Sequence, residues 1–271
     1  MTRVDSLTIA LAVALLQLSQ CYAGENSIAE SDWHGFSRLN FKVDGRDCIL
    51  VEPQKAAAGN PWIWRTEYFD HEPQVDLALA HRGYHIAYMD VQDMYGSPAA
   101  LDHLDKFYEY LIVHHKLNAK PVLEGFSRGA IYALNWAARR PNCVAAIYND
   151  APVCDVRSWP GGFGRGPGSK SDWSAMLKAY EIEEEPPKVS PHNPIDNLAP
   201  LAKARIPLLH VCGSADEVVP MEENTSLLAE RYKRLGGHIE VIEKPGVGHH
   251  PHSLKDPAPI LEFIVRSSET P

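Results

Sequence analysis

One serine in this sequence stands where a strand pattern gives way to a helix pattern. The stretch "VLEGFSRGAIYALNWAARRP" places Ser127 between Gly125 and Gly129. A nucleophile elbow needs this context, because its tight turn strains the serine backbone and leaves no room for side chains two residues away. The helix that follows would point free N–H groups at the charge developing on an attacked carbonyl oxygen. We predict that Ser127 is a nucleophile. The alternative is an inert serine in a glycine-flanked turn.

A serine hydroxyl is a poor nucleophile, so a base and an orienting acid should follow it along the chain. The stretch "LLHVCGSADEVVP" supplies Asp216 just past an apolar strand, and Asp150 after "AIYN" is the alternative acid. The stretch "VIEKPGVGHHPHSL" then supplies a histidine directly after a glycine-rich turn. We predict the triad Ser127, Asp216 and His249, with His249 as the base.

The histidines beside His249 allow other roles. Metal binding is the alternative for His249, His250 and His252, but no clustered cysteines or nearby carboxylates accompany them in the sequence. We therefore expect no metal and no other cofactor. His252 is a candidate for substrate contact.

An attacked carbonyl needs two hydrogen-bond donors for its oxygen. The backbone N–H of Arg128, directly after the serine, is the first expected donor. The second should come from the loop after the aromatic strand "PWIWRTEYF", where Trp64 and Arg65 are the candidates.

The elements that must position these residues alternate between strand and helix. Such alternation predicts an α/β fold with a mostly parallel central sheet and helices on both faces. Sites in these sheets lie beyond the carboxyl ends of the strands. Strands are expected within 46–53, 60–69, 84–91, 121–126, 144–153, 206–214 and 238–246, and helices at 73–83, 97–117, 128–140, 221–236 and 258–267.

One segment breaks the alternation. Residues 155–200 are rich in glycine and proline yet carry Trp159, Phe163 and Trp173. Inserted loops of this length are usually functional or disordered, and the aromatic residues argue against disorder. We interpret the segment as a cap-like insertion over the site.

The N-terminal segment and the net charge indicate where the protein is located and what it binds. Residues 1–23 resemble an export signal, with Arg3, an apolar run and a small-residue cleavage site after Ala23, which leaves one α/β domain at 24–271. A lipid anchor at Cys21 is the alternative to a periplasmic or secreted protein. The formal net charge of −9 disfavours binding to nucleic acid or anionic membranes.

Four cysteines remain after residue 23, and an exported chain could pair them in disulfides. The sequence does not say how Cys48, Cys143, Cys154 and Cys212 would pair. Cys212 lies in an apolar strand pattern, which favours a buried thiol there.

The motif order "GFSRG", "GSADEVVP" and "GVGHHPHS" resembles the α/β-hydrolase superfamily over nearly all of residues 24–271. Within it, "PWIWRTEYF", "EGFSRGA", "DAPVCDVRSWPGG" and "GHHPHSL" resemble exported bacterial carbohydrate esterases. This narrower resemblance implies cleavage of ester groups on a polysaccharide, either methyl esters of uronic acids or acetyl esters.

Residue chemistry suggests how such a substrate would be held. Arg65 and Arg128 would bind a carboxylate, and Trp159 would stack on a sugar ring. The alternative is that the arginines form ion pairs inside the protein and that the tryptophan packs the cap. A serine peptidase of the same fold and a non-catalytic carbohydrate-binding protein are the alternative functions.

Overall fold

The computed structural model describes residues 28–183 and 192–268. The predicted export signal at 1–23 and the alternative lipid anchor at Cys21 lie outside the described residues. Among the described residues, no helix is both long enough and apolar enough to cross a membrane.

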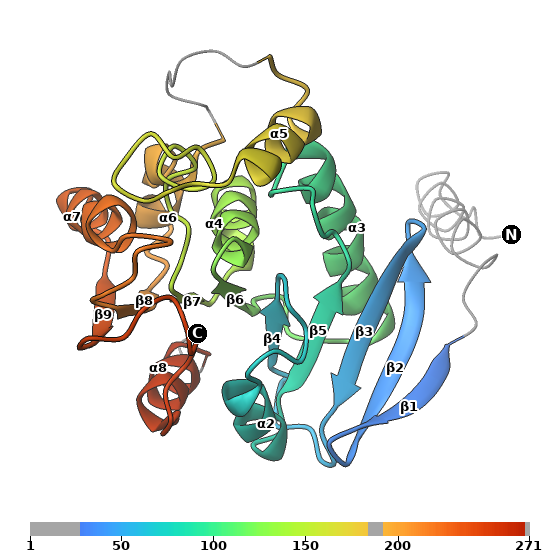
Figure 1. The fold of residues 1–271 in the computed structure, drawn as a ribbon. Coiled ribbons are helices and arrows are strands. Elements are labelled where there is room, and N and C mark those ends of the chain that lie inside the picture. The colour runs from blue at the N-terminus through green and yellow to red at the C-terminus, as the bar shows by residue number, and fades with distance from the viewer. Residues whose placement is uncertain (1–27, 184–191, 269–271) are drawn as a thin grey trace, which may run out of the picture.

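A single twisted sheet organises the described chain (Figure 1). Its strands lie in the order β1-β2-β3-β5-β4-β6-β7-β8-β9. The pairs joining β1, β2, β3 and β5 are antiparallel, and all pairs from β5 through β9 are parallel. The strands are β1 (Ala29–Trp33), β2 (Phe36–Val43), β3 (Arg46–Glu52), β4 (Trp62–Arg65), β5 (His85–Met89), β6 (Val122–Phe126), β7 (Ala146–Asp150), β8 (Leu208–Gly213) and β9 (Ile239–Lys244).

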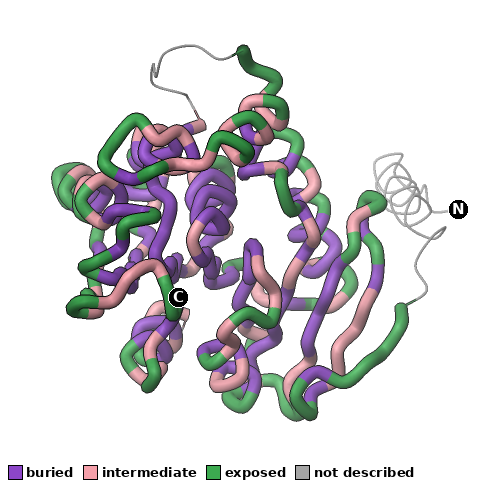
Figure 2. Tube along the Cα trace, viewed as in Figure 1, coloured by how far each residue is buried: buried purple, intermediate pink, exposed green. Residues whose placement is uncertain are grey.

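Helices cover both faces of this sheet and bury two apolar cores. One face carries α3, α4, α6 and α7, and the other carries α2 and α8. Figure 2 shows that the inner strands and α4 are the most deeply buried parts. The helices are α2 (Gln74–His81), α3 (Pro98–His114), α4 (Gly129–Arg139), α5 (Lys170–Ala179), α6 (Ala199–Lys203), α7 (Leu227–Arg234) and α8 (Ala258–Ser268). The predicted α/β-hydrolase fold is confirmed.

The sequence prediction missed the antiparallel hairpins at the sheet edge. β2 turns into β3 through Asp44 and Gly45, whose φ angles are 54° and 74°. Two left-handed residues in an Asp-Gly pair are typical of a two-residue hairpin turn. The Asp44-Gly45 pair directly before the strand "RDCILVE" is the sequence signal that another strand, β2, precedes it.

The segment at 155–200 lies between β7 and β8, as an insertion should. Its helix α5 begins at the N-cap Ser169, whose hydroxyl accepts a hydrogen bond from the N–H of Asp172. Met176 of α5 is buried in a small apolar cluster with Tyr95, Ile131 and Val153. The inserted helix is therefore packed on the core next to α4.

All four cysteines of the described chain are free thiols. Cys48, Cys154 and Cys212 are buried, which confirms the prediction for Cys212. Its Sγ lies 3.1 Å from Oγ1 of Thr225, and burial raises the pKa of the thiol to about 12. A buried thiol of this kind is unreactive.

Arg65, predicted to bind substrate, instead lies inside the protein. Its side chain is 1% exposed and forms an ion pair with Asp76, and Glu124 Oε2 lies 3.8 Å away. Burial, and next the neighbouring Asp76, raise the pKa of Glu124, so one guanidinium mainly balances one carboxylate. The prediction of a substrate contact at Arg65 is wrong, because its guanidinium points into the core and lies 4.2 Å from the Phe126 ring centre.

Replacing Arg65 tests this buried network. We expect Arg65→Met to lower the free energy of unfolding by about 3–5 kcal/mol, because Asp76 would be left as an uncompensated buried charge. Lys42→Met is the matched control, since Lys42 pairs with Asp47 at the surface and its loss should cost under about 1 kcal/mol. Urea unfolding measures both. Equal losses in the two variants would contradict the assignment.

Candidate active site

The strand-to-helix turn at Ser127 has the strained backbone expected of an elbow. Ser127 has a φ of 48°, which a non-glycine residue adopts only where its surroundings enforce it. Its N–H donates to the carbonyl of Asp150 at 2.9 Å, and its carbonyl accepts from Val153 at 3.0 Å and from Ala130 at 3.2 Å. These bonds tie the turn to the end of β7 and to the start of α4.

The two flanking glycines are needed for space. A Cβ on Gly125 would lie 2.6 Å from both the Cα of Ala130 and the Oδ1 of Asn149. A Cβ on Gly129 would lie 3.2 Å from side-chain atoms of Thr66 and Glu67. The first conflict involves backbone, so the turn cannot close around a larger residue at 125.

The structure brings the three predicted triad residues together. His249 Nε2 lies 3.0 Å from Ser127 Oγ, and His249 Nδ1 lies 2.8 Å from Asp216 Oδ2. The Asp216 side chain is 2% exposed and that of His249 is 10% exposed. A serine, an imidazole and a buried carboxylate linked in this order can transfer a proton from the hydroxyl to the ring.

Backbone contacts fix the acid and the base relative to each other. Asp216 Oδ1 accepts hydrogen bonds from the N–H groups of Val218 and Val219 at 2.9 and 2.8 Å. The N–H of Ala215 donates to the carbonyl of Val247 at 2.9 Å and so joins the two loops. Gly213 permits this approach, because a Cβ there would lie 2.2 Å from the Val247 oxygen.

The alternative acid, Asp150, has other partners. Its Oδ1 lies 3.1 Å from Nδ1 of His252, and its Oδ2 accepts hydrogen bonds from the Ser253 N–H at 2.8 Å and the Tyr148 hydroxyl at 3.0 Å. Asp150 therefore orients His252 and not His249. His252, predicted as a substrate contact, is 3% exposed.

The backbone N–H groups of Trp64 and Arg65 are not placed to act as the second hydrogen-bond donor to an attacked carbonyl oxygen. Trp64 lies inside β4, paired with β5 on one side and β6 on the other, and Arg65 is paired with Glu124 of β6. The prediction that Trp64 or Arg65 supplies this donor is wrong, because the backbone of both residues is paired with neighbouring strands of the sheet. Within the described chain, Glu67 is the first residue past β4 whose N–H makes no hydrogen bond, since the Thr66 N–H donates to Glu124.

The side chain of Arg128 is saturated by neighbours. Its Nε lies 3.0 Å from both carboxylate oxygens of Glu67, and its terminal nitrogens lie 3.0 Å from Asp93 and 3.1 Å from Asp172. Burial is the largest single influence and lowers the pKa of Arg128, but Glu67 and the neighbouring Tyr68 and Tyr95 together outweigh it and raise the pKa. The prediction that Arg128 binds a substrate carboxylate is wrong, because its donors already meet carboxylates. Its backbone N–H makes no hydrogen bond within the described residues.

The insertion reaches the site through its helix α5. Asp172 of α5 bonds Arg128, and it also accepts a hydrogen bond of 2.7 Å from the Tyr95 hydroxyl. Trp159, predicted to stack on sugar, is half-buried against the small cluster that holds α5. The inserted segment thus contacts the residue that directly follows the nucleophile.

The acidic partners of Arg128 were not predicted from the sequence. Glu67, Asp93 and Asp172 are 61, 35 and 44 residues from Arg128 by chain position, and no spacing links them. The only available signal was the position of Glu67, within the aromatic stretch "PWIWRTEYF" and two residues past the end of β4.

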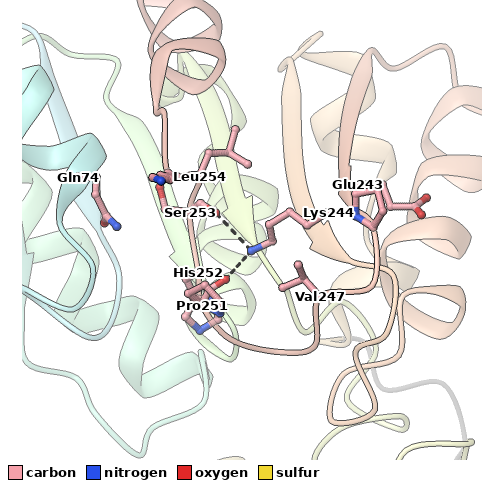
Figure 3. Close-up of a pocket in the computed structure, with 10 residues that line it drawn as sticks. Gln74, Glu243, Lys244, Val247, Pro251, His252, Ser253 and Leu254 are labelled. Atoms are coloured by element: carbon pink, nitrogen blue, oxygen red, sulfur yellow. Dashed lines mark hydrogen bonds between the residues drawn. The ribbon is translucent and has the colours of Figure 1, made fainter.

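Lys244 anchors the loop that carries the base. Its Nζ donates to the carbonyls of Pro251 at 2.6 Å and Ser253 at 3.3 Å (Figure 3). A pocket lined by Gln74, Val247 and Leu254 lies beside these bonds. Because Ser127 does not line this pocket, we assign it no part in the chemistry.

Comparison with known proteins places this geometry in context. Residues 100–269 match the model of the prolyl oligopeptidase family. No curated protein matches the sequence.

Solved structures share the fold at low sequence identity. Dipeptidyl peptidase 4 of Porphyromonas gingivalis superposes with a TM-score of 0.61 at 17% identity, covering 94% of this chain and 37% of that one. An acylaminoacyl peptidase of Pyrococcus horikoshii gives a TM-score of 0.56 at 17% identity, covering 86% of this chain and 39% of that one. This chain therefore spans less than two fifths of the length of these peptidases.

These matches confirm the resemblance to the α/β-hydrolase superfamily. They do not show the narrower resemblance to carbohydrate esterases. They favour instead the serine peptidase that the sequence left as an alternative.

Substitution of the flanking glycines tests the elbow. We expect Gly125→Ala to lower the free energy of unfolding by about 1–3 kcal/mol, because the added methyl would overlap backbone. Gly129→Ala is the matched control and should cost less, since the side chains it meets can move. Chemical denaturation measures both, and a larger loss at 129 would contradict this account of the turn.

Removing the acid tests the triad. We expect Asp216→Asn to lower kcat by about 10⁴-fold, because the imidazole loses the partner that fixes its tautomer. Glu217→Gln, at the exposed neighbouring position, should leave kcat unchanged. Asp150→Asn should lower kcat less than Asp216→Asn does. Steady-state kinetics decides, and the acid would be reassigned if Asp150→Asn were the more damaging change.

Proposed function

Since the chain belongs to the prolyl oligopeptidase family of serine hydrolases, we propose that it hydrolyses peptide bonds. Ser127 is the nucleophile, His249 the base and Asp216 the acid that orients it. The observation that carries this proposal is the continuous chain of contacts from Ser127 through His249 to Asp216, at 3.0 and 2.8 Å.

The proposed reaction proceeds in two halves. His249 takes the proton of the Ser127 hydroxyl as its oxygen attacks the carbonyl carbon, and Asp216 stabilises the imidazolium. His249 then gives this proton to the leaving amine, and an acyl-enzyme remains. Water, activated by the same imidazole, releases the acid and restores the serine.

Two backbone groups are proposed to hold the carbonyl oxygen while it is negative. The first is the N–H of Arg128 at the start of the elbow helix, and the second is the N–H of Glu67 at the end of β4. Both are free of hydrogen bonds within the described chain. The two segments are in contact, since a Cβ on Gly129 would lie 3.6 Å from the Glu67 nitrogen.

The charge beside the nucleophile supports a peptide with a positively charged group. Three carboxyl groups, those of Glu67, Asp93 and Asp172, surround the single guanidinium of Arg128. The side chain of Asp93 is 70% exposed, so it remains accessible to a ligand. An excess of acidic groups attracts an ammonium such as a free peptide N-terminus and repels a carboxylate.

A carbohydrate ester is the second candidate substrate. It is favoured by Trp159, whose side chain is partly exposed and therefore available for stacking on a sugar. The uronate form of this hypothesis is weakened, because both arginines expected to bind its carboxylate are already paired. An acetylated sugar needs no such partner.

We also propose that the protein is exported. This rests on the apolar run at 7–18 and the small residues before position 24.

A substrate panel tests the proposed function. We expect release of p-nitroaniline from aminoacyl and peptidyl p-nitroanilides, faster with a free N-terminus than with an acetylated one. Ser127→Ala should lower kcat by at least about 10⁴-fold. Asp93→Asn should reduce the preference for the free N-terminus without abolishing turnover.

The other outcomes of this panel point to the other functions. Methanol or acetate released from esterified pectin, without p-nitroaniline, would replace the peptide proposal with the carbohydrate ester. Failure of a fluorophosphonate probe to label Ser127 in the folded protein would leave only a binding role.

A further inference from the structure

Three histidines from two loops meet beside the triad. His71 follows β4, while His250 and His252 follow β9. Their candidate ligand nitrogens all lie within 4.8 Å of one another. His71 and His250 are exposed and His252 is buried, so the group opens to solvent on one side.

Both loops that carry these histidines are fixed to the core. The buried guanidinium of Arg65 donates to the backbone carbonyl of His71 and, at 3.1 Å, to that of Tyr68. Lys244 holds the carbonyls on either side of His252, as Figure 3 shows. The histidines are therefore presented by anchored backbone on both sides.

The buried histidine is oriented as metal-bound histidines are. His252 Nδ1 lies 3.1 Å from Asp150 Oδ1, and neither side chain is more than 2% exposed. A carboxylate on one ring nitrogen fixes the tautomer and leaves the other nitrogen as a ligand. Glu72 adds a second carboxylate, which accepts the His252 N–H at 2.6 Å and lies 3.6 Å from His71 Nε2.

We propose that His71, His250 and His252 form a binding site for a divalent transition metal ion, with Zn²⁺ as the best fit. Three imidazoles and an open position are a common zinc arrangement, whereas Mg²⁺ and Ca²⁺ take oxygen ligands. Ligand nitrogens around tetrahedral zinc lie about 3.4 Å apart. The exposed rings of His71 and His250 can close this difference by rotating about their side-chain bonds.

The site would place a positive charge at the edge of the triad. The ring of the base His249 lies with its centre 5.0 Å from that of His250 and 5.2 Å from that of His252. The open coordination position is then available to water or to an oxygen of the substrate. This inference does not depend on the proposed peptide substrate.

Zinc affinity tests the proposal without reference to activity. The full chain, free of any polyhistidine tag, is titrated with Zn²⁺ in competition with a chromophoric chelator. We expect one equivalent to bind, and His71→Ala and His250→Ala each to weaken binding by more than about 100-fold, the upper loss seen on removing an outer partner. Asp150→Asn, which keeps all three imidazoles, should weaken it by about 10–100-fold.

His238→Ala is the matched control, because His238 is an exposed histidine paired with Glu240 away from the site. It should bind Zn²⁺ as the unchanged protein does, and excess Mg²⁺ should not compete. Thermal melts check that every variant is folded. The proposal is overturned if the unchanged protein binds no more tightly than His71→Ala/His250→Ala, or if His238→Ala loses as much affinity.

Discussion

The left-handed backbone of Ser127 is the constraint on which the rest of this site depends. A φ of 48° at a serine is unfavourable by about 1–3 kcal/mol and persists because neighbours over-determine it. Its N–H is held by β7 and its carbonyl by α4 and by the chain after β7. The strain fixes where the hydroxyl points, and the bare positions at Gly125 and Gly129 let strand and helix close around it.

Two separate groups of charged residues surround the elbow, one around Arg65 and one around Arg128. Beneath it, Arg65 pairs with Asp76 inside the core, where burial raises the pKa of the neighbouring Glu124. Beside it, Arg128 is surrounded by carboxyl groups from three separate segments. Both guanidiniums are paired with carboxyl groups of the protein in this arrangement, where the sequence suggested free cations for a ligand.

The sequence allowed the fold and the triad positions to be predicted, because both depend on local signals. Periodicity marks strands such as Val122–Phe126, and the order of Ser127, Asp216 and His249 follows the order of strand ends. Side-chain partners were not predictable in the same way. Whether Arg128 meets a substrate or meets Asp172 depends on contacts between segments far apart in the chain, and an arginine near a serine looks the same in either case.

Several hydrogen bonds join the acid loop to the base loop: the N–H groups of Ser214 and Ala215 donate to the carbonyls of Lys244 and Val247, and the N–H of Gly246 donates to the Ser214 hydroxyl. Asp216 and His249 are therefore held relative to each other by backbone contacts as well as by their own hydrogen bond. Gly213 carries no reactive group, yet it is what allows the two loops to touch. A position without any functional group thus decides whether the acid and the base can meet, because even a methyl group at 213 would collide with the backbone of the base loop.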